Sequence, residues 1–207
     1  VFAAPGDPEA LARWTARAAA IGAEARPCDP RERVPGLTAE VRESLFLADD
    51  WRLDAEDTLT AMLRAFETAG GRRLEGRVAA LDGVSVALAD GARVEAGAVV
   101  LAGGHTVLSP VPLTPVHGQL VRFDEAGPRD GAVLRTPAGY LAPSRRGVLF
   151  GATMRSGATE PDAAVEADQR AAARALIPAL ERERAVTRSG VRAATPDGLP
   201  AVGRLSP

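Results

Sequence analysis

The stretch from residue 139 to residue 154 constrains the fold most, because it predicts two short strands joined by a tight turn. Two apolar runs, Tyr140–Ala142 and Val148–Ala152, flank the basic pair Arg145 and Arg146. Two apolar runs with a short polar connection are typical of a β-hairpin. The chain is therefore expected to contain an antiparallel sheet.

Further strands are predicted on both sides of this hairpin. Val84–Leu88 alternates in polarity and lies between Asp82-Gly83 and Asp90-Gly91, which are strong turn signals. Ala98–Ala102 is a continuous apolar run, the pattern of a strand buried on both faces. The remaining predicted strands are Val116–Phe123, Ala132–Thr136 and Ala185–Arg192. The last one leads into a loop rich in proline and glycine.

Three helices are predicted between these strands. The first begins at Asp7-Pro8, an N-cap followed by proline at the first helical position. The second spans about Asp54–Ala69, and the third about Pro161–Arg184, where Pro178 should end or kink it. The apolar face of the first helix is expected to carry Leu11, Trp14, Ala18 and Ile21.

The mixed order of helices and strands predicts an α/β fold with α+β character. An antiparallel sheet would be inserted into a larger nucleotide-binding unit. The chain is expected to change from one unit to the other near Trp51 and Thr106, and to return near Arg188.

Composition excludes several classes of protein. The net charge is −2, which gives no basic surface for nucleic acid. Cys28 is the single cysteine, so an intrachain disulfide is excluded. One cysteine and two histidines without ligand spacing argue against a metal site.

No run approaches the roughly 18 apolar residues of a membrane span, and the amino end has no signal-peptide pattern. A cytoplasmic protein is the default expectation.

Three motifs resemble the substrate half of the D-amino acid oxidase–like flavoenzymes, and most closely their glycine oxidase group. They are Tyr140-Leu-Ala-Pro-Ser, Gly151-Ala-Thr-Met154 and Gly190-Val-Arg192. The resemblance covers essentially the whole chain. It implies an FAD-dependent oxidoreductase that oxidises the amine of glycine or a small amino acid to an imine. Oxygen would accept the electrons and give hydrogen peroxide, and the pathway would be thiamine biosynthesis.

The resemblance also implies a division into domains. Residues 1–52 and 107–188 would form the substrate domain, and residues 53–106 and 189–207 part of the FAD-binding domain. None of the 21 glycines is two residues from another, so the dinucleotide fingerprint G-x-G-x-x-G cannot occur. We therefore expect these residues to be an internal part of a longer protein, inactive by themselves. The alternative is a complete small domain without flavin.

The family motifs assign roles to three residues at the substrate. Arg192 would bind the substrate carboxylate, since a guanidinium matches a carboxylate bidentately. Tyr140, the only tyrosine, would donate a hydrogen bond to the same group. Met154 would line the substrate pocket near the flavin. The open alternatives are a surface arginine, a half-buried strand tyrosine and a methionine in the core.

Flavin contacts are implied for Val78, Gly103 and Gly104. The family usually has Trp-Ser after the glycine pair, whereas this chain has His105-Thr106, which puts detailed contacts there in doubt. His117 replaces an arginine in a turn that is structural in the family, so we do not expect it to be a general base. No side chain is expected to act as acid or base, because binding would orient the substrate toward the cofactor.

Other functions remain open. The chain could belong to a D-amino acid dehydrogenase, a sarcosine oxidase, or the oxidase part of a tRNA-modifying enzyme. It could also be a flavin-free module that binds amino acids. A truncated, inactive domain would expose an apolar face and could aggregate or form a homo-oligomer.

Overall fold

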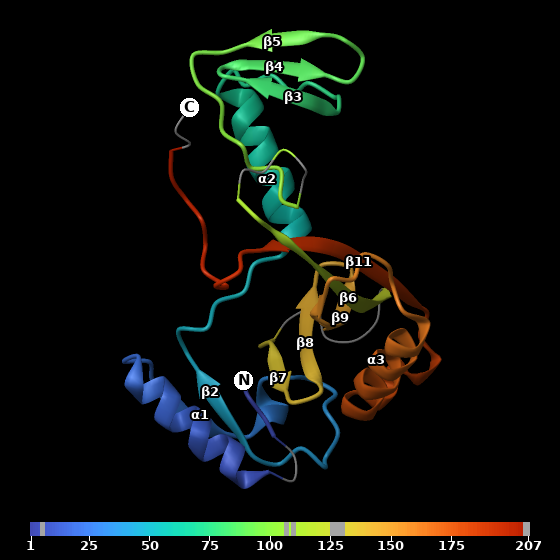
Figure 1. The fold of residues 1–207 in the computed structure, drawn as a ribbon. Helices are drawn as coiled ribbons and strands as arrows, with labels where there is room; N and C mark the ends of the chain where they lie inside the picture. The colour runs from blue at the N-terminus through green and yellow to red at the C-terminus, as the bar shows by residue number, and fades with distance from the viewer. Residues whose placement is uncertain (5–6, 106–107, 109–110, 125–130, 205–207) are drawn as a thin grey trace. The chain divides into compact units, whose positions relative to one another are not determined.

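The computed structural model describes residues 1–4, 7–105, 108, 111–124 and 131–204 (Figure 1). Contacts divide the chain into two compact units. The first comprises residues 1–54, 117–155 and 160–190, and the second comprises residues 55–116, 156–159 and 191–207. The expected change of unit near Thr106 lies outside the described residues. Which unit binds substrate and which binds flavin stays a prediction.

A six-stranded sheet dominates the first unit. Five strands lie in the order β10–β6–β9–β8–β7, and a further strand, β11, pairs with β6. Its strands are β6 (Thr114–Asp124), β7 (Leu134–Thr136), β8 (Gly139–Ser144), β9 (Gly147–Gly151), β10 (Arg155–Ser156) and β11 (Ala185–Ala194). The predicted hairpin is confirmed, because β8 and β9 are antiparallel and pair from Tyr140 with Gly151 to Ser144 with Gly147.

The amino-terminal residues extend this sheet. Arg135 on β7 donates its backbone N–H to the Val1 carbonyl, and Ala3 donates to the Arg135 carbonyl. On the other side, Phe2 and Leu45 exchange two backbone hydrogen bonds of 2.8 Å. Leu45 belongs to β2 (Ser44–Leu47), which pairs with β1 (Ala25–Cys28). The sequence did not predict β1 or β2.

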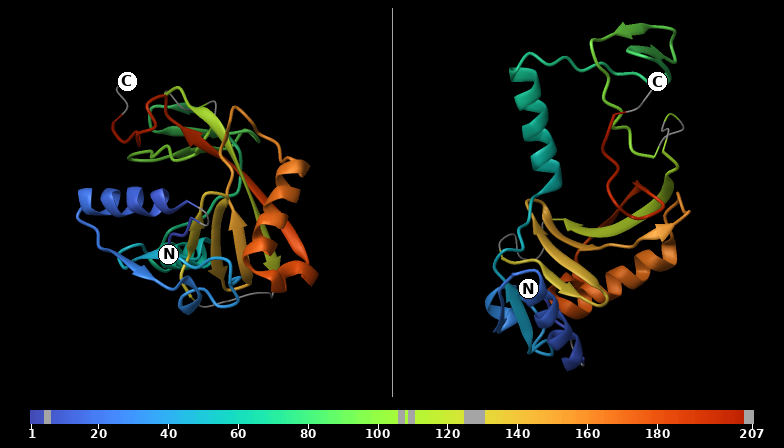
Figure 2. Two further views of the ribbon diagram at one scale, coloured as in Figure 1. Left: turned by 90° about the horizontal axis from the view of Figure 1, so that it is seen from below. Right: turned by 60° about the vertical axis from the view of Figure 1, so that its left-hand side comes forward.

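One face of the sheet packs against α3 (Ala163–Leu176), which lies on one side of it in Figures 1 and 2. Asp162 caps this helix, because its side chain accepts hydrogen bonds from two backbone N–H groups of the first turn. Pro178 ends the helix as predicted and begins a 3-10 turn, Pro178–Arg182. The core between sheet and helix includes Val121, Phe123, Leu134, Leu141, Val148, Phe150, Ala173, Leu176, Ile177 and Leu180.

The first helix, α1 (Pro8–Ala20), packs beside β1 and β2. Asp7 caps it as predicted, since its carboxylate accepts the backbone N–H of Ala10 at 2.9 Å. Trp14 lies against Phe2, with ring centroids 4.6 Å apart. The predicted face was wrong at Ile21, which follows the helix and is 78% exposed.

The second unit contains α2 (Ala55–Thr68) and a three-stranded antiparallel sheet. Its strands are β3 (Val78–Asp82), β4 (Ser85–Leu88) and β5 (Arg93–Glu95). The turn at Asp82-Gly83 is confirmed, with Gly83 at a φ of +57° that glycine adopts without strain. None of the residues of α2 is buried.

The prediction of a buried strand at Ala98–Ala102 was wrong. These residues have no strand assignment, and Val100 is 88% exposed. An apolar run becomes a buried strand only when neighbouring strands supply hydrogen bonds and cover its faces. Within the described residues, the sheet of the second unit consists of β3, β4 and β5 alone.

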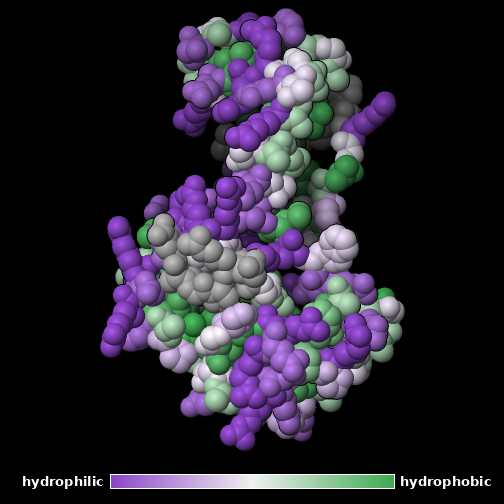
Figure 3. Space-filling view, turned by 180° about the vertical axis from the view of Figure 1, so that it is seen from behind, coloured by the Kyte–Doolittle hydropathy of each residue, from purple (hydrophilic) through white to green (hydrophobic). Residues whose placement is uncertain are grey.

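The surface seen in Figure 3 is mostly hydrophilic, with hydrophobic residues in small groups. This agrees with a composition in which 25% of residues are charged. In the part of the chain that is described, no helix is both long enough and apolar enough to cross a membrane.

Replacing Phe150 by alanine should lower the free energy of unfolding by about 3–5 kcal/mol, because a fully buried ring would leave a cavity. The matched control is Ile21→Ala, a large apolar residue of the same unit that is 78% exposed. The control should change stability by no more than about 0.5 kcal/mol. Urea unfolding followed by circular dichroism measures both, and equal losses would contradict the assigned core.

Candidate functional site

Tyr140 lies on the face of the sheet that points away from α3. Leu141, the next residue of β8, is fully buried in the core beside α3. Because successive side chains of a strand point to opposite faces, Tyr140 points to the other side. It is half-buried there, and its cross-strand neighbours are Arg135 on β7 and Gly151 on β9. The candidate substrate face therefore carries the chain's only tyrosine.

Two glycines next to Tyr140 are required by close packing. At Gly151, an added Cβ would lie 2.6 Å from the Cβ of Leu120 on β6. Gly139 has a φ of +146°, and a Cβ there would lie 2.8 Å from the Gly151 carbonyl oxygen. Neither position has room for a side chain. The glycines keep the strands around Tyr140 in close contact.

Met154 follows β9 and is 74% exposed. It does not belong to the core that the described residues form. The adjacent Thr153 is anchored to β6, since its backbone N–H donates to the Gln119 carbonyl at 3.1 Å. Its hydroxyl also accepts the backbone N–H of Gln119 at 3.0 Å. Met154 is thus an accessible apolar side chain on a fixed backbone, and its role as a pocket wall stays a prediction.

Arg192 lies near the end of β11, and its side chain is exposed. This strand pairs with β6, so Arg192 and Tyr140 belong to strands of the same sheet. By contacts, Arg192 is assigned to the second unit and Tyr140 to the first. The role of Arg192 as a carboxylate ligand stays a prediction.

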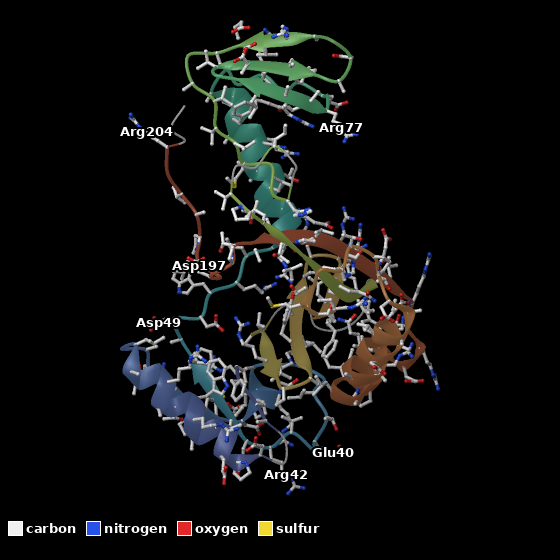
Figure 4. The ribbon with its side chains drawn as sticks, in the orientation of Figure 1. Glu40, Arg42, Asp49, Arg77, Asp197 and Arg204 are labelled. Atoms are coloured by element: carbon white, nitrogen blue, oxygen red, sulfur yellow. The ribbon has the colours of Figure 1, made fainter. Side chains whose placement is uncertain are left out.

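The loop after β11 is organised by Asp197, which Figure 4 labels. Its carboxylate accepts the backbone N–H of Leu199 at 3.0 Å, and this hydrogen bond lowers the pKa of Asp197. The Thr195 hydroxyl donates to the Leu199 carbonyl at 2.6 Å. Gly198 adopts a φ of +72°, as a tight turn requires. Asp197 thus holds the loop that follows β11 in its turn conformation.

The residues predicted to contact flavin lie in the second unit. Val78 is the half-buried first residue of β3, directly after Arg77, and pairs with Leu88 (Figure 4). Gly103 and Gly104 are exposed and have no regular secondary structure. An added Cβ at Gly104, whose φ is +66°, would meet no atom within 4 Å. The backbone is therefore open to close approach, as a contact with a flat cofactor would need.

These three residues fit only part of an FAD molecule. The described backbone around Gly103 and Gly104 is exposed, and β3, which begins at Val78, is an edge strand of its sheet. The pyrophosphate requires a glycine-rich turn at a helix N-terminus. The 207 residues contain no G-x-G-x-x-G sequence, so the residues named here do not account for pyrophosphate binding.

His117 lies within β6 and not in the predicted turn. Its side chain is 1% exposed, and neither ring nitrogen has a hydrogen-bond partner among the described residues. The neighbouring Gln119 joins β6 to α3, because its side-chain amide exchanges two hydrogen bonds of 2.9 Å with the backbone of Asp162. Gln169 of α3 donates to the Gln119 carbonyl at 2.7 Å. His117 has no solvent access and is not a candidate general base.

Sequence analysis missed an ion pair next to Tyr140. The Arg135 guanidinium donates from Nε and Nη2 to the two oxygens of Asp50, each at 3.0 Å. All 25 basic residues are arginine, so the sequence carries no signal that singles out Arg135. Its significance follows only from the register that places Arg135 opposite Tyr140. The described residues contain no cluster of three or more side chains that could hold a metal ion.

Comparison with known proteins identifies the family to which this chain belongs. The family described as "FAD dependent oxidoreductase" (DAO) matches residues 1–207. The chain therefore belongs to the DAO family of FAD-dependent oxidoreductases.

Two glycine oxidase structures share the fold. One from Geobacillus kaustophilus superposes with a TM-score of 0.79 at 23% identity, covering 99% of this chain and 61% of that one. One from Bacillus cereus ATCC 14579 gives 0.81 at 19% identity, covering 98% and 62%. L-proline dehydrogenase from P. horikoshii gives 0.74 at 20% identity, covering 99% and 63%. The fold prediction, a mixed helix and strand architecture with antiparallel sheets, is thereby confirmed.

Two curated relatives are tRNA 5-methylaminomethyl-2-thiouridine biosynthesis bifunctional proteins MnmC. The protein from Caulobacter sp. (strain K31) is 40% identical over 124 residues, which are 54% of this chain and 20% of that protein. The protein from Maricaulis maris (strain MCS10) is 40% identical over 138 residues, 63% of this chain and 23% of that protein. The matched region thus spans about a fifth of the length of these relatives.

Gly151→Ala should lower the free energy of unfolding by about 1–3 kcal/mol, because the new Cβ would collide with Leu120. The matched control is Gly190→Ala on β11, where an added Cβ meets no atom within 4 Å. The control should be neutral or slightly stabilising. Equal urea midpoints for Gly151→Ala and the wild type would show that β6 and β9 are not this close.

Proposed function

We propose that this chain forms the substrate-binding part of an FAD-dependent amine oxidase acting on glycine or another small amino acid. The observation that carries the proposal is family membership over residues 1–207, together with a fold close to two glycine oxidases. Oxygen would be the electron acceptor, with hydrogen peroxide as product. Thiamine biosynthesis and a cytoplasmic location are parts of the same proposal.

The substrate carboxylate is bound by Arg192 and Tyr140 in this proposal. A guanidinium offers a planar fork of donors that matches both carboxylate oxygens, and a phenol adds one neutral donor. In support, Arg192 is exposed near the end of β11, and Tyr140 is half-buried on the sheet face away from α3. Fixing the carboxylate leaves the amine and the Cα free to face the cofactor.

Bound FAD would supply the electron sink that takes up the hydride from the Cα. Of the residues in this chain, Val78, Gly103 and Gly104 are proposed to contact it through their backbone. Met154, which is 74% exposed, would border the substrate and exclude water. No side chain is assigned a proton-transfer role, because the unprotonated amine itself assists departure of the hydride. Orientation is then the main contribution of the protein.

A second candidate substrate is an amine on a modified uridine of tRNA. The observation in its favour is the 40% identity to the two MnmC proteins over 124 and 138 residues. A secondary amine on a nucleoside and a small amino acid pose the same oxidation chemistry but differ greatly in size. The size of the substrate is therefore the property that separates the two candidates.

A side-by-side assay tests these alternatives. Glycine, sarcosine, D-alanine and tRNA carrying modified uridine are supplied to the FAD-loaded product of the complete gene, and hydrogen peroxide is measured. The proposal predicts peroxide from glycine or sarcosine. Peroxide formed from the tRNA but from none of the amino acids would favour the second candidate. An enzyme that binds flavin but oxidises none of the four compounds would overturn both candidate functions.

Arg192→Ala should lower kcat/KM for glycine on the order of 100-fold or more, equivalent to about 3 kcal/mol, through loss of a charge-assisted pair. Tyr140→Phe should cost less, roughly tenfold, because it removes one neutral hydrogen bond. The matched control is Arg188→Ala, an exposed arginine of the same strand. Unchanged catalytic efficiency in Arg192→Ala would remove this residue from the site.

A further inference from the structure

Four residues are aligned across four neighbouring strands of the six-stranded sheet. Arg135 on β7 is opposite Tyr140 on β8, and Tyr140 is opposite Gly151 on β9. Gly151 is in turn opposite Leu120 on β6 (Figure 1). Directly opposed residues of antiparallel strands have their side chains on the same face. These four residues, here called the cross-strand row, therefore place Leu120 on the same face as Tyr140.

Gly151 makes Leu120 and Tyr140 neighbours on this face, because no side chain lies between them in the row. An added Cβ at Gly151 would lie 2.6 Å from the Cβ of Leu120, so the Leu120 side chain begins directly beside the Gly151 backbone. Gly151 itself is buried, whereas Leu120 and Tyr140 are half-buried. The accessible surface in this part of the row is thus formed by Tyr140 and Leu120.

The two sides of Tyr140 differ in polarity. On one side, the Arg135 guanidinium donates to both carboxylate oxygens of Asp50, each at 3.0 Å. On the other side, Leu120 offers an aliphatic surface. An apolar group next to a charged pair would cost the pair part of its solvation, whereas contact with leucine buries apolar area favourably. A ligand bound at Tyr140 would therefore place its apolar part over Leu120.

The backbone of Leu120 is fixed from the opposite face of the sheet. The flanking residues Gln119 and Val121 are 1% and 0% exposed. Gln119 also exchanges two side-chain hydrogen bonds of 2.9 Å with the backbone of Asp162. A side chain that discriminates between ligands by size must be held in place, because a mobile one would move aside for a larger ligand. Leu120 meets this requirement.

We propose that Leu120 is a specificity-determining residue whose side chain contacts the group on the substrate Cα and limits its size. The Cα is bonded directly to the carboxylate carbon, so its substituent is the apolar group nearest to Tyr140. The substrate class is then amino acids that carry hydrogen or a methyl group on the Cα. This inference rests on the proposed function, because it takes the substrate to be a small carboxylate bound at Tyr140.

Three achiral carboxylates test the inference by binding alone. Acetate, propionate and 3-methylbutyrate correspond to glycine, alanine and valine without the amine. Titration calorimetry measures their dissociation constants for the FAD-loaded product of the complete gene. The compared quantity is the ratio of the Kd of each larger carboxylate to that of acetate, since an effect common to all carboxylates cancels. The wild type should bind 3-methylbutyrate about tenfold more weakly than acetate.

Leu120→Ala should lower the 3-methylbutyrate ratio at least about tenfold, because it makes room for the branched chain. Leu120→Phe should raise the propionate ratio about tenfold, because the larger ring occupies the space of the methyl group. The ratio of kcat/KM for valine to that for glycine, measured with both enantiomers of valine, should rise in Leu120→Ala by a factor similar to the change in binding.

The matched control is Leu47→Ala, the same change at a half-buried leucine on β2 that packs beside Phe2 and Ala10. It should leave both binding ratios within about twofold of the wild type, because Leu47 lies outside the cross-strand row. If Leu120→Ala fails to fold into a flavin-binding protein, Leu120→Val replaces it. This milder variant should lower the 3-methylbutyrate ratio about twofold to threefold.

The outcomes separate this inference from the proposed function. If the carboxylates bind but their ratios are unchanged in the Leu120 variants, or change equally in Leu47→Ala, the role of Leu120 is overturned and the proposed function stands. If the wild-type protein binds none of the three carboxylates, the carboxylate site itself fails and the role of Leu120 fails with it.

Discussion

The packing of the six-stranded sheet on α3 determines the orientation of the other residues in the first unit. Leu141 and Phe150 are fully buried between the sheet and the helix. Because their strands are in register, burying them turns Tyr140 to the opposite face. A one-residue shift of β8 would turn Tyr140 to the face that α3 covers. The core thus sets the direction of the candidate substrate residue without any contact to substrate.

Polar contacts hold neighbouring segments to the sheet that the apolar core orients. Gln119 links β6 to the start of α3 through two hydrogen bonds with Asp162, which also caps the helix. On the opposite face, Arg135 links β7 through Asp50 to the segment between β2 and α2. The first contact holds the sheet to its covering helix, and the second holds an exposed segment beside Tyr140. Both depend on the same strand register.

Much of the fold could be predicted because its signals are local. Asp7-Pro8 marked the start of α1 and Pro178 the end of α3. The Asp82-Gly83 turn marked the β3–β4 hairpin, and two apolar runs around the basic pair Arg145-Arg146 marked the β8–β9 hairpin. The failure at Ala98–Ala102 has the opposite cause, since burial of a strand depends on neighbours distant in sequence. The missed strands β1 and β2 likewise pair with each other, and β2 also pairs with Phe2, across long separations.

The candidate site was predictable only in part. Family motifs drew attention to Arg192, Tyr140 and Met154, and their roles remain predictions. The ion pair between Asp50 and Arg135 could not be predicted from the sequence, because 85 residues separate the partners. The requirement for glycine at position 151 also arises from a neighbouring strand, where Leu120 occupies the space of a Cβ. Such constraints appear only when the register of the strands is known.

Anaerobic titration of the FAD-loaded complete gene product with glycine tests the central claim most directly. The account predicts that glycine bleaches the absorbance of the oxidised flavin, because Arg192 and Tyr140 hold its carboxylate and present the Cα to the cofactor. A flavin spectrum that stays oxidised with glycine, sarcosine and D-alanine alike would contradict an amino acid oxidase.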